Sequence, residues 1–240
     1  MVGRLDECFL VSYAIDRDRA AALLPAGLEP LTAVGAAFAN VVACRVDRMR
    51  PAGLPRALGV TYWHVAIRLQ ARARLADGQL REGLHFLRSD ADRRTLAWLG
   101  ARLTDFRFHA ARIRFAPDGA GGGELRLDRT SPGGQADGRM VFAAGDGALV
   151  AGSCFSSAEE RDRVLAYAPL GLATDPAGRV LRVAEVVRDE TAWRESPVDV
   201  KVMEWPVLAA LLGPHRLERA TRVEPLDYRW RLGVTERLAR

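Results

Sequence analysis

The stretch Val60-Thr-Tyr-Trp-His-Val-Ala-Ile-Arg-Leu-Gln70 alternates between two kinds of side chain. Successive side chains of a β-strand point to opposite faces of its sheet, so this pattern predicts a strand with two different faces. One face is apolar and typical of a core: Trp63, Val65, Ile67 and Leu69. The other is polar and aromatic, which suits either the lining of a cavity or a wet outer surface: Tyr62, His64, Ala66 and Arg68.

Similar strand patterns recur along most of the chain. The other predicted strands are Ala37–Val46, Leu80–Arg88, Asp105–Phe115, Glu124–Arg129, Arg139–Ala143, Ala148–Gly152, Val180–Val187, Val198–Met203 and Thr221–Trp230. Many neighbouring strands are separated by turn residues rather than by helices. This spacing favours an antiparallel sheet over a doubly wound parallel one.

Four short helices are expected between the strands, each from a capping signal. The signals are Asp16 for a helix that Pro25 ends, Ser89 or Asp90 for a second, Ser157 with Glu160 for a third, and Pro206 with Gly213 around a fourth. The sequence therefore predicts a β-rich α+β protein with a closed or strongly curved sheet and a few short peripheral helices.

Length and composition indicate one domain that covers residues 1–240. A chain with 49% hydrophobic and 27% charged residues is ordinary for a soluble globular protein. The longest apolar runs are too short to span a bilayer, so no membrane partner is expected. No basic-then-apolar leader opens the sequence, and three widely spaced cysteines indicate reduced thiols. We therefore expect a cytoplasmic protein.

The net charge of +5 does not form a nucleic-acid footprint. Arginines are spread along the chain, and the densest group, within residues 45–56, contains Asp47 and no interleaved aromatic residue. Four scattered histidines and three distant cysteines show no zinc-ligand spacing. We therefore expect no nucleic-acid partner, no metal and no cofactor.

Lysine is almost absent, since Lys201 stands alone beside 34 arginines. A Schiff base requires a neutral amine, and a guanidinium stays protonated at any usable pH. Any imine chemistry would therefore use Lys201 or the α-amino group. Lys201 shares a predicted strand face with Asp199 and Met203, opposite a row of valines, so we expect it to be exposed and not catalytic.

Several short motifs occur in an order that resembles a known family. They are Phe9-Leu-Val-Ser-Tyr13, Leu24-Pro-Ala-Gly-Leu28, Met49-Arg-Pro-Ala-Gly-Leu-Pro55, Gly59-Val-Thr-Tyr62 and Gly83-Leu-His-Phe-Leu-Arg-Ser-Asp90. The first two resemble the opening of the acetoacetate decarboxylase-like superfamily, and the others resemble its DUF2071 branch of bacterial proteins. The resemblance covers most of the chain and is strongest over residues 9–115. It implies a single domain with an antiparallel, cone-like β-barrel that encloses a small-molecule cavity.

The catalytic residues of acetoacetate decarboxylase are replaced in this chain. In that enzyme one lysine forms an imine with a β-keto acid, and a second lysine lowers the pKa of the first. Arg88 and Ser89 stand at the positions that match the two lysines, and His64 stands at the position of a cavity glutamate. The resemblance therefore implies the cavity without the imine.

His64 and Arg88 are the predicted catalytic residues. An imidazole commonly titrates near neutral pH and could move protons at a substrate carbonyl, although it could equally be satisfied by one structural hydrogen bond. Arg88 shares a predicted face with Leu84 and Phe86 and could clamp a carboxylate; the alternative is an ion pair with Asp90 or Asp92. The predicted ligand-contacting residues are Tyr62, Arg68, Phe86 and Ser89, of which Ser89 also fits a helix cap.

Other chemical groups are interpreted as structural. Cys154 is more typical of a small buried side chain than of a nucleophile. Tyr228 and Trp230 share one face of a predicted strand, a pattern more typical of a core than of a ligand site.

These residues predict a small-molecule-binding protein or enzyme with an internal cavity for an organic acid or carbonyl compound. The predicted chemistry is proton transfer without a lysine Schiff base. Two alternatives stay open: a non-catalytic ligand-binding or sensory module, and a structural protein with a filled barrel. The expected partner is a small molecule, with a carboxylate as its favoured charged group. A symmetric homo-oligomer is expected only because such assemblies are common among soluble proteins.

Overall fold

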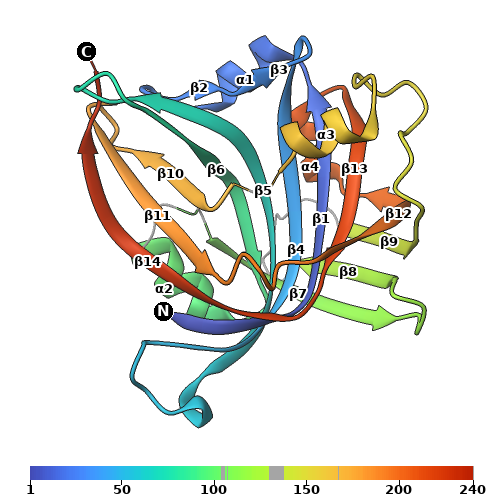
Figure 1. Ribbon diagram of the computed structural model, residues 1–240. Helices are drawn as coiled ribbons and strands as arrows, with labels where there is room; N and C mark the ends of the chain where they lie inside the picture. The colour runs from blue at the N-terminus through green and yellow to red at the C-terminus, as the bar shows by residue number, and fades with distance from the viewer. Residues whose placement is uncertain (104–105, 107, 130–137, 167, 240) are drawn as a thin grey trace.

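Long β-strands make up most of the molecule (Figure 1). The computed structural model describes residues 1–240 except 104–105, 107, 130–137, 167 and 240. Its strands are β1 (Val2–Ile15), β2 (Glu29–Pro30), β3 (Thr32–Ala33), β4 (Ala36–Arg50), β5 (Val60–Arg74), β6 (Leu80–Ala91), β7 (Phe108–Pro117), β8 (Gly123–Arg129), β9 (Gly138–Ala144), β10 (Leu170–Thr174), β11 (Val180–Arg188), β12 (Glu195–Glu204), β13 (His215–Val223) and β14 (Leu226–Arg237). The helices are α1 (Arg17–Leu23), α2 (Arg94–Leu103), α3 (Ala158–Val164) and α4 (Pro206–Leu212), with a 3-10 turn, η1, at Arg56–Leu58.

The strands form two rings of hydrogen-bonded neighbours that share one wall. The first, called the cavity ring below, runs β1–β4–β5–β6–β10–β11–β14 and back to β1. The second, called the core ring, runs β1–β4–β5–β6–β7–β8–β9–β12–β13 and back to β1. Strands β1, β4, β5 and β6 belong to both and are called the shared wall. In Figure 1 the cavity ring lies to the left of β1 and β4, and the core ring lies to the right.

The sheet is mixed, not wholly antiparallel as the sequence predicts. Strand β6 pairs in parallel with β7 and with β10, and the other described ladders are antiparallel. Parallel neighbours need a crossover connection, and α2 supplies one between β6 and β7. With this correction, the predicted β-rich single domain with a barrel-like closed sheet and short helices is confirmed.

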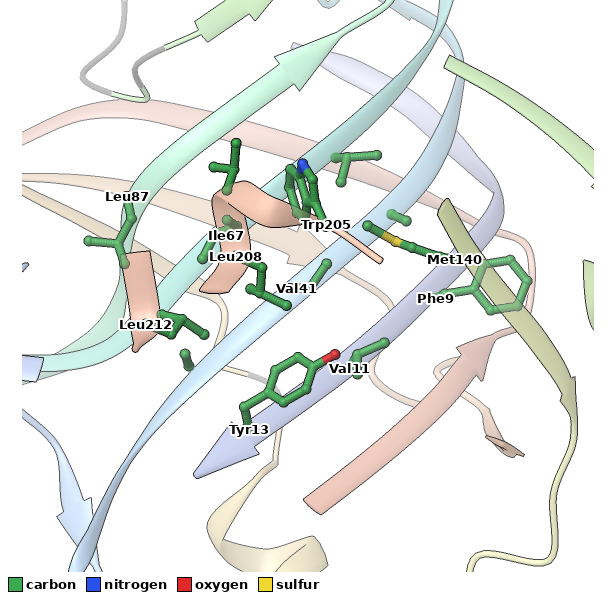
Figure 2. Packing of buried hydrophobic residues seen from close by; sticks show 14 of the residues in the cluster. Phe9, Val11, Tyr13, Val41, Ile67, Leu87, Met140, Trp205, Leu208 and Leu212 are labelled. Carbon is green, nitrogen blue, oxygen red and sulfur yellow. The ribbon is translucent and has the colours of Figure 1, made fainter. Parts of the chain in front are cut away.

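The core ring is filled by side chains, as Figure 2 shows. Alternation along the shared wall directs Phe9, Val41 and Ile67 into this ring, and each of them is at most 1% exposed. Helix α4 lies inside the ring, where Leu208 and Leu212 pack against the shared wall. Across the interior of the core ring, the phenyl group of Phe9 on β1 stacks on that of Phe142 on β9. This ring is therefore the main hydrophobic core.

Three predicted strands differ from those observed. The run predicted as one strand at Thr221–Trp230 is divided between β13 and β14, because Pro225 has no backbone N–H to continue a ladder. Residues Ala148–Gly152 do not form a strand. The predicted strand Asp105–Phe115 begins partly outside the described residues and is observed as β7 from Phe108. Strands β1 and β10 occur where the pattern predicts none.

Three of the four predicted helix starts match the structure. The Asp16 side chain accepts a hydrogen bond from the backbone N–H of Arg19 at the start of α1, and Ser157 caps α3 in the same way. Helix α4 begins at Pro206 and ends before Gly213. The predicted caps of α2 are wrong, because β6 continues to Ala91 and takes up both proposed residues. None of the described helices combines the length and the apolar character that crossing a membrane requires.

Candidate functional site

A cavity of about 280 Å³ lies inside the cavity ring. Its walls are the second face of the shared wall and, across from it, side chains of β11 and β14. Most of the lining is aliphatic or aromatic: Leu5, Leu10, Val42, Val46, Met49, Tyr62, Phe86, Leu96, Phe106, Phe108, Val186, Trp193, Tyr228 and Trp230. Such a lining with a few polar groups is typical of a site for a small organic molecule.

His64 is one of those polar groups. It lies on β5, directly across from Cys44 on β4, and is 8% exposed. Its ring stacks on that of Phe108, with 5.3 Å between the centroids. Its Nε2 atom is buried and has no hydrogen-bond partner among the described residues. Buried polar atoms are normally paired, so this nitrogen is available to a molecule in the cavity.

Arg68 provides a positive charge on the same face of β5. It is 5% exposed, and its Nε donates a hydrogen bond of 3.1 Å to Oδ1 of Asn40. The guanidinium carbon lies 5.8 Å from the ring centroid of Phe86. This hydrogen bond to the neutral side-chain amide of Asn40 orients the guanidinium. An arginine held in this way is suited to bind a carboxylate.

Two cysteines lie beside His64 on the cavity face. Cys8 on β1 and Cys44 on β4 are Cα partners in adjacent antiparallel strands. Both thiols are free, both residues are buried, and both line the cavity. Cys44 pairs with Cys8 on one side and with His64 on the other. Cys8, Cys44 and His64 therefore form a row across three strands of the shared wall, called the thiol row below.

Hydrogen bonding within the thiol row shifts the pKa values of its two thiols in opposite directions. The hydrogen bond from Cys8 lowers the pKa of Cys44, and the hydrogen bond from His64 and the charges of His64 and Arg68 act in the same sense against burial. The same hydrogen bond raises the pKa of Cys8 well above its usual value, and burial raises it further. Cys44 is therefore the sulfur that carries negative charge more readily.

A β-bulge in β6 changes the side on which Arg88 lies. Ile67 pairs with Arg88, whereas Arg68 pairs with Phe86, so Leu87 is an extra residue without a direct partner. Phe86 therefore lines the cavity, and Leu87 packs in the core ring. Arg88 lies across from Ile67, on the core side. The predicted common face of Phe86 and Arg88 is wrong for this reason.

Arg88 and Ser89 are not among the described residues that line the cavity. Nε and Nη2 of Arg88 donate to the two carboxylate oxygens of Asp90 at 2.6 and 2.7 Å. Of the two roles that the sequence allows for Arg88, the structure therefore shows the ion pair with Asp90. Ser89 is fully buried in β6, and its Oγ has no hydrogen-bond partner among the described residues. The structure thus places His64 and Arg68 on the wall of one cavity and Arg88 outside its described lining.

Aromatic residues complete the cavity, and several of them come from distant parts of the chain. Tyr62 and Phe86 line it, the two aromatic positions that the sequence singles out. Tyr228 and Trp230 belong to an apolar cluster, as the sequence predicts, and this cluster also lines the cavity. Arg188, which no sequence pattern singles out, lines the cavity as well. Its guanidinium carbon lies 3.3 Å from the ring centroid of Trp193. These residues reach the cavity only because the ring closes.

Lys201 is exposed on β12, where its Nζ donates to Oδ2 of Asp199 at 2.9 Å. It is not part of the described lining of the cavity. In the part of the chain that the structure describes, no group of His, Cys, Asp or Glu side chains is arranged to hold a metal ion. The polar side-chain groups in the described lining include imidazole, guanidinium, thiol and phenol groups.

Comparison with known families gives one match over most of the chain. The family DUF2071, described as an uncharacterized conserved protein, matches residues 3–163. None of the curated proteins in the comparison matches.

Solved structures that share the fold include enzymes of related architecture. An acetoacetate decarboxylase-like enzyme from Sphingomonas wittichii RW1 is 20% identical, with a TM-score of 0.59 over 99% of this chain and 92% of that one. Acetoacetate decarboxylase from Legionella pneumophila is 13% identical, with a TM-score of 0.62 over 99% and 87%. The enduracididine biosynthesis enzyme MppR, complexed with the condensation product of pyruvate and imidazole 4-carboxaldehyde, is 16% identical, with a TM-score of 0.59 over 99% and 89%. At these identities the likeness shows a common fold.

Proposed function

Because this chain belongs to the DUF2071 family, whose description assigns no activity, we propose a function from the cavity itself: proton transfer on a small carbonyl compound that is bound without an imine. The observation that carries the proposal is the buried, unpartnered Nε2 of His64 at the wall of an apolar cavity. A neutral imidazole there removes a proton from the carbon next to the ligand's carbonyl group, and returns it in the reverse step.

Arg68 is the proposed anchor and electrostatic partner of His64. Its charge holds a carboxylate on the ligand, or stabilises the enolate oxygen that forms when the proton leaves. The sequence suggests Arg88 for this binding of a carboxylate, but Nε and Nη2 of Arg88 donate to Asp90. Tyr62 and Phe86 are the proposed walls against the apolar part of the ligand.

An imine is not part of this proposal. Lys201 is exposed, forms an ion pair with Asp199 and is not among the described lining residues of the cavity. A second solved structure of MppR, which has the same fold, is a complex with pyruvate. This supports pyruvate as the first ligand to test, because it combines a carbonyl, a carboxylate and exchangeable α-protons.

The test is deuterium exchange into the methyl group of pyruvate in heavy water, followed by NMR. The protein is expected to accelerate the exchange, and His64→Gln is expected to reduce that acceleration by about a hundredfold or more, as general-base catalysis typically contributes. His109→Gln is the matched control, because His109 is exposed and is not among the described lining residues. Equal exchange by the His64→Gln variant and the unmodified protein would contradict the proposal.

Two further measurements separate the alternatives. Borohydride added with pyruvate should leave Lys201 unmodified, and a stable adduct there would show that an imine forms. If pyruvate raises the melting temperature but no exchange occurs, the cavity belongs to a non-catalytic binding module. Ligand present at about a hundred times its Kd adds about 2.7 kcal/mol to stability, so such binding would be visible.

A further inference from the structure

The proposed proton transfer does not use the two sulfurs of the thiol row. Cys8 and Cys44 lie on the same wall as His64, and both border the cavity. Two thiols that face one space on adjacent strands are a different feature from an isolated buried cysteine, which acts as a small hydrophobic residue.

The register of β1 against β4 places these thiols where a disulfide can form. Directly opposed residues of an antiparallel pair have Cα atoms about 4.5 or 5.5 Å apart, and both values fall within the range of about 4.4 to 6.8 Å found in disulfides. Cys8 and Cys44 are such a pair, and both line the same cavity. The spacing of the two strands is therefore compatible with an S–S bond, which would form by side-chain rotation and a small approach of the two Cβ atoms.

The surroundings make the two sulfurs unequal. The thiolate is the reactive form of cysteine, and it is favoured beside cationic groups. The charge of Arg68 and a hydrogen bond from His64 both act on Cys44 in this direction, as the lowered pKa of its thiol reflects. Cys154 offers an internal contrast, because burial and a hydrogen bond with Glu218 raise its pKa. Cys44 is thus the nucleophile, and Cys8 is the neighbour that holds a proton.

Access to the pair runs through the cavity. Cys8 and Cys44 are 2% and 5% exposed, so a bulky polar oxidant cannot reach them easily from the surface. The adjoining space of about 280 Å³ admits a small molecule, and its largely apolar lining favours an organic one.

We propose that Cys8 and Cys44 form a redox-active dithiol that reduces hydroperoxides entering the cavity. The thiolate of Cys44 attacks the terminal oxygen of the hydroperoxide, the O–O bond breaks, and the alkoxide leaves as an alcohol after taking up the proton that Cys44 released when it ionised. Cys44 is then a sulfenic acid. The sulfur of Cys8 attacks that of Cys44, the S–O bond breaks, and water leaves with the Cys8 proton.

The two electrons that reduce the hydroperoxide come from the two thiols, which end as a disulfide. A second turnover requires a thiol reductant, which exchanges with the disulfide and restores both thiols. This activity needs no carbonyl ligand, although it shares the cavity, His64 and Arg68 with the proposed proton transfer.

The first test uses the reduced protein without substitution. It is treated with an equimolar amount of tert-butyl hydroperoxide, the remaining thiols are alkylated, and the non-reduced peptides are mapped by mass spectrometry. The expected result is a peptide that links Cys8 to Cys44, one tert-butanol formed per link, and an alkylated Cys154. Oxidation of Cys154 while Cys8 and Cys44 stay reduced would overturn the proposal, and this outcome does not depend on any variant.

Variants then assign the roles of the sulfurs. Cys44→Ala is expected to slow the consumption of hydroperoxide at least about tenfold, since the activated thiolate is lost. Cys8→Ala is expected to stop at a sulfenic acid on Cys44, which dimedone traps. Cys154→Ala is the matched control and should react like the unsubstituted protein. Unchanged consumption in Cys44→Ala, with near-ultraviolet circular dichroism showing an intact fold, would contradict the assignment.

Discussion

The core ring and the cavity ring share four strands, and yet their interiors differ. Along the shared wall, Phe9, Val41 and Ile67 point into the core ring, where α4 packs against them. The neighbouring residues of the same strands, such as Cys8 and Val42, point into the cavity. Because side chains alternate along a strand, one set of strands can stabilise the fold with one face and form a site with the other.

The difference between the rings lies in what they enclose. Helix α4 enters the core ring, and its apolar side chains occupy the interior. On the other side, α2 contributes Leu96 to the lining but leaves a space of about 280 Å³. The contrast predicts that equivalent substitutions on the two faces have different consequences, which three pairs of variants can test.

The largest expected effect concerns the two arginines. Arg88→Met should destabilise the protein by about 3 kcal/mol, because Asp90, whose side chain is 3% exposed, would lose its charged partner. Arg68→Met should leave stability closer to normal and weaken the binding of a carboxylate ligand by about ten- to a hundredfold, the value of a hydrogen bond to a charged group. Urea denaturation measures the first effect, and calorimetric titration with pyruvate measures the second.

A neutral ligand of similar size provides the control for these arginine variants. Butanone carries no carboxylate, so its affinity should be similar in the Arg68→Met variant and in the unsubstituted protein. If Arg88→Met abolished pyruvate binding while the protein stayed folded, the assignment of Arg88 to structure and Arg68 to the site would be reversed.

A smaller difference is expected between two adjacent valines of β4. Val41 is 1% exposed in the core ring, and Val42 is 6% exposed beside the cavity. Val41→Ala should lower the free energy of unfolding by about 2 kcal/mol, the transfer free energy of two carbons plus the cost of a new void. Val42→Ala only enlarges an existing space, so a loss of about 1 kcal/mol is expected. Equal losses in denaturant titrations would show that both interiors are packed alike.

The smallest change in stability is expected when the cavity is filled. Val42→Phe places a larger side chain in free space, so the free energy of unfolding should change by less than about 1 kcal/mol. Val41→Phe is the matched control on the core face, where overpacking should cost about 1 to 3 kcal/mol. Val42→Phe should also abolish the stabilisation by pyruvate in a thermal shift assay. Persistent stabilisation would place the ligand outside the cavity ring.

The sequence predicts the two faces of β5 because alternation is a local property. His64 and Arg68 fall on one face in the pattern, and both line the cavity in the structure. The bulge at Leu87 is not visible in the same way. An extra residue in β6 becomes apparent only when that strand is paired with β5, and it moves Arg88 to the opposite side from the one that simple alternation predicts.

The thiol row depends on information that is even less local. Cys8 and Cys44 meet because of the register between β1 and β4, and Cys44 meets His64 through the register between β4 and β5. Trp230 reaches the same space from the end of the chain through the closure of the ring. Spacing along the sequence specifies neither register nor closure, so these contacts require the three-dimensional structure.

The cavity ring closes through one short pairing between β6 and β10. Strands β6 and β10 meet through the pairing of Leu84 with Gly171, the shortest ladder among the described pairings of that ring. A Cβ atom added to Gly171 would lie 3.4 Å from the rings of Phe86 and Phe106, so this pairing lies directly behind the cavity wall. Segments held by few hydrogen bonds separate most readily in the native state. We therefore expect this pairing to open more readily than the other ladders of the cavity ring, and amide hydrogen exchange at Leu84 and Gly171 measures this opening.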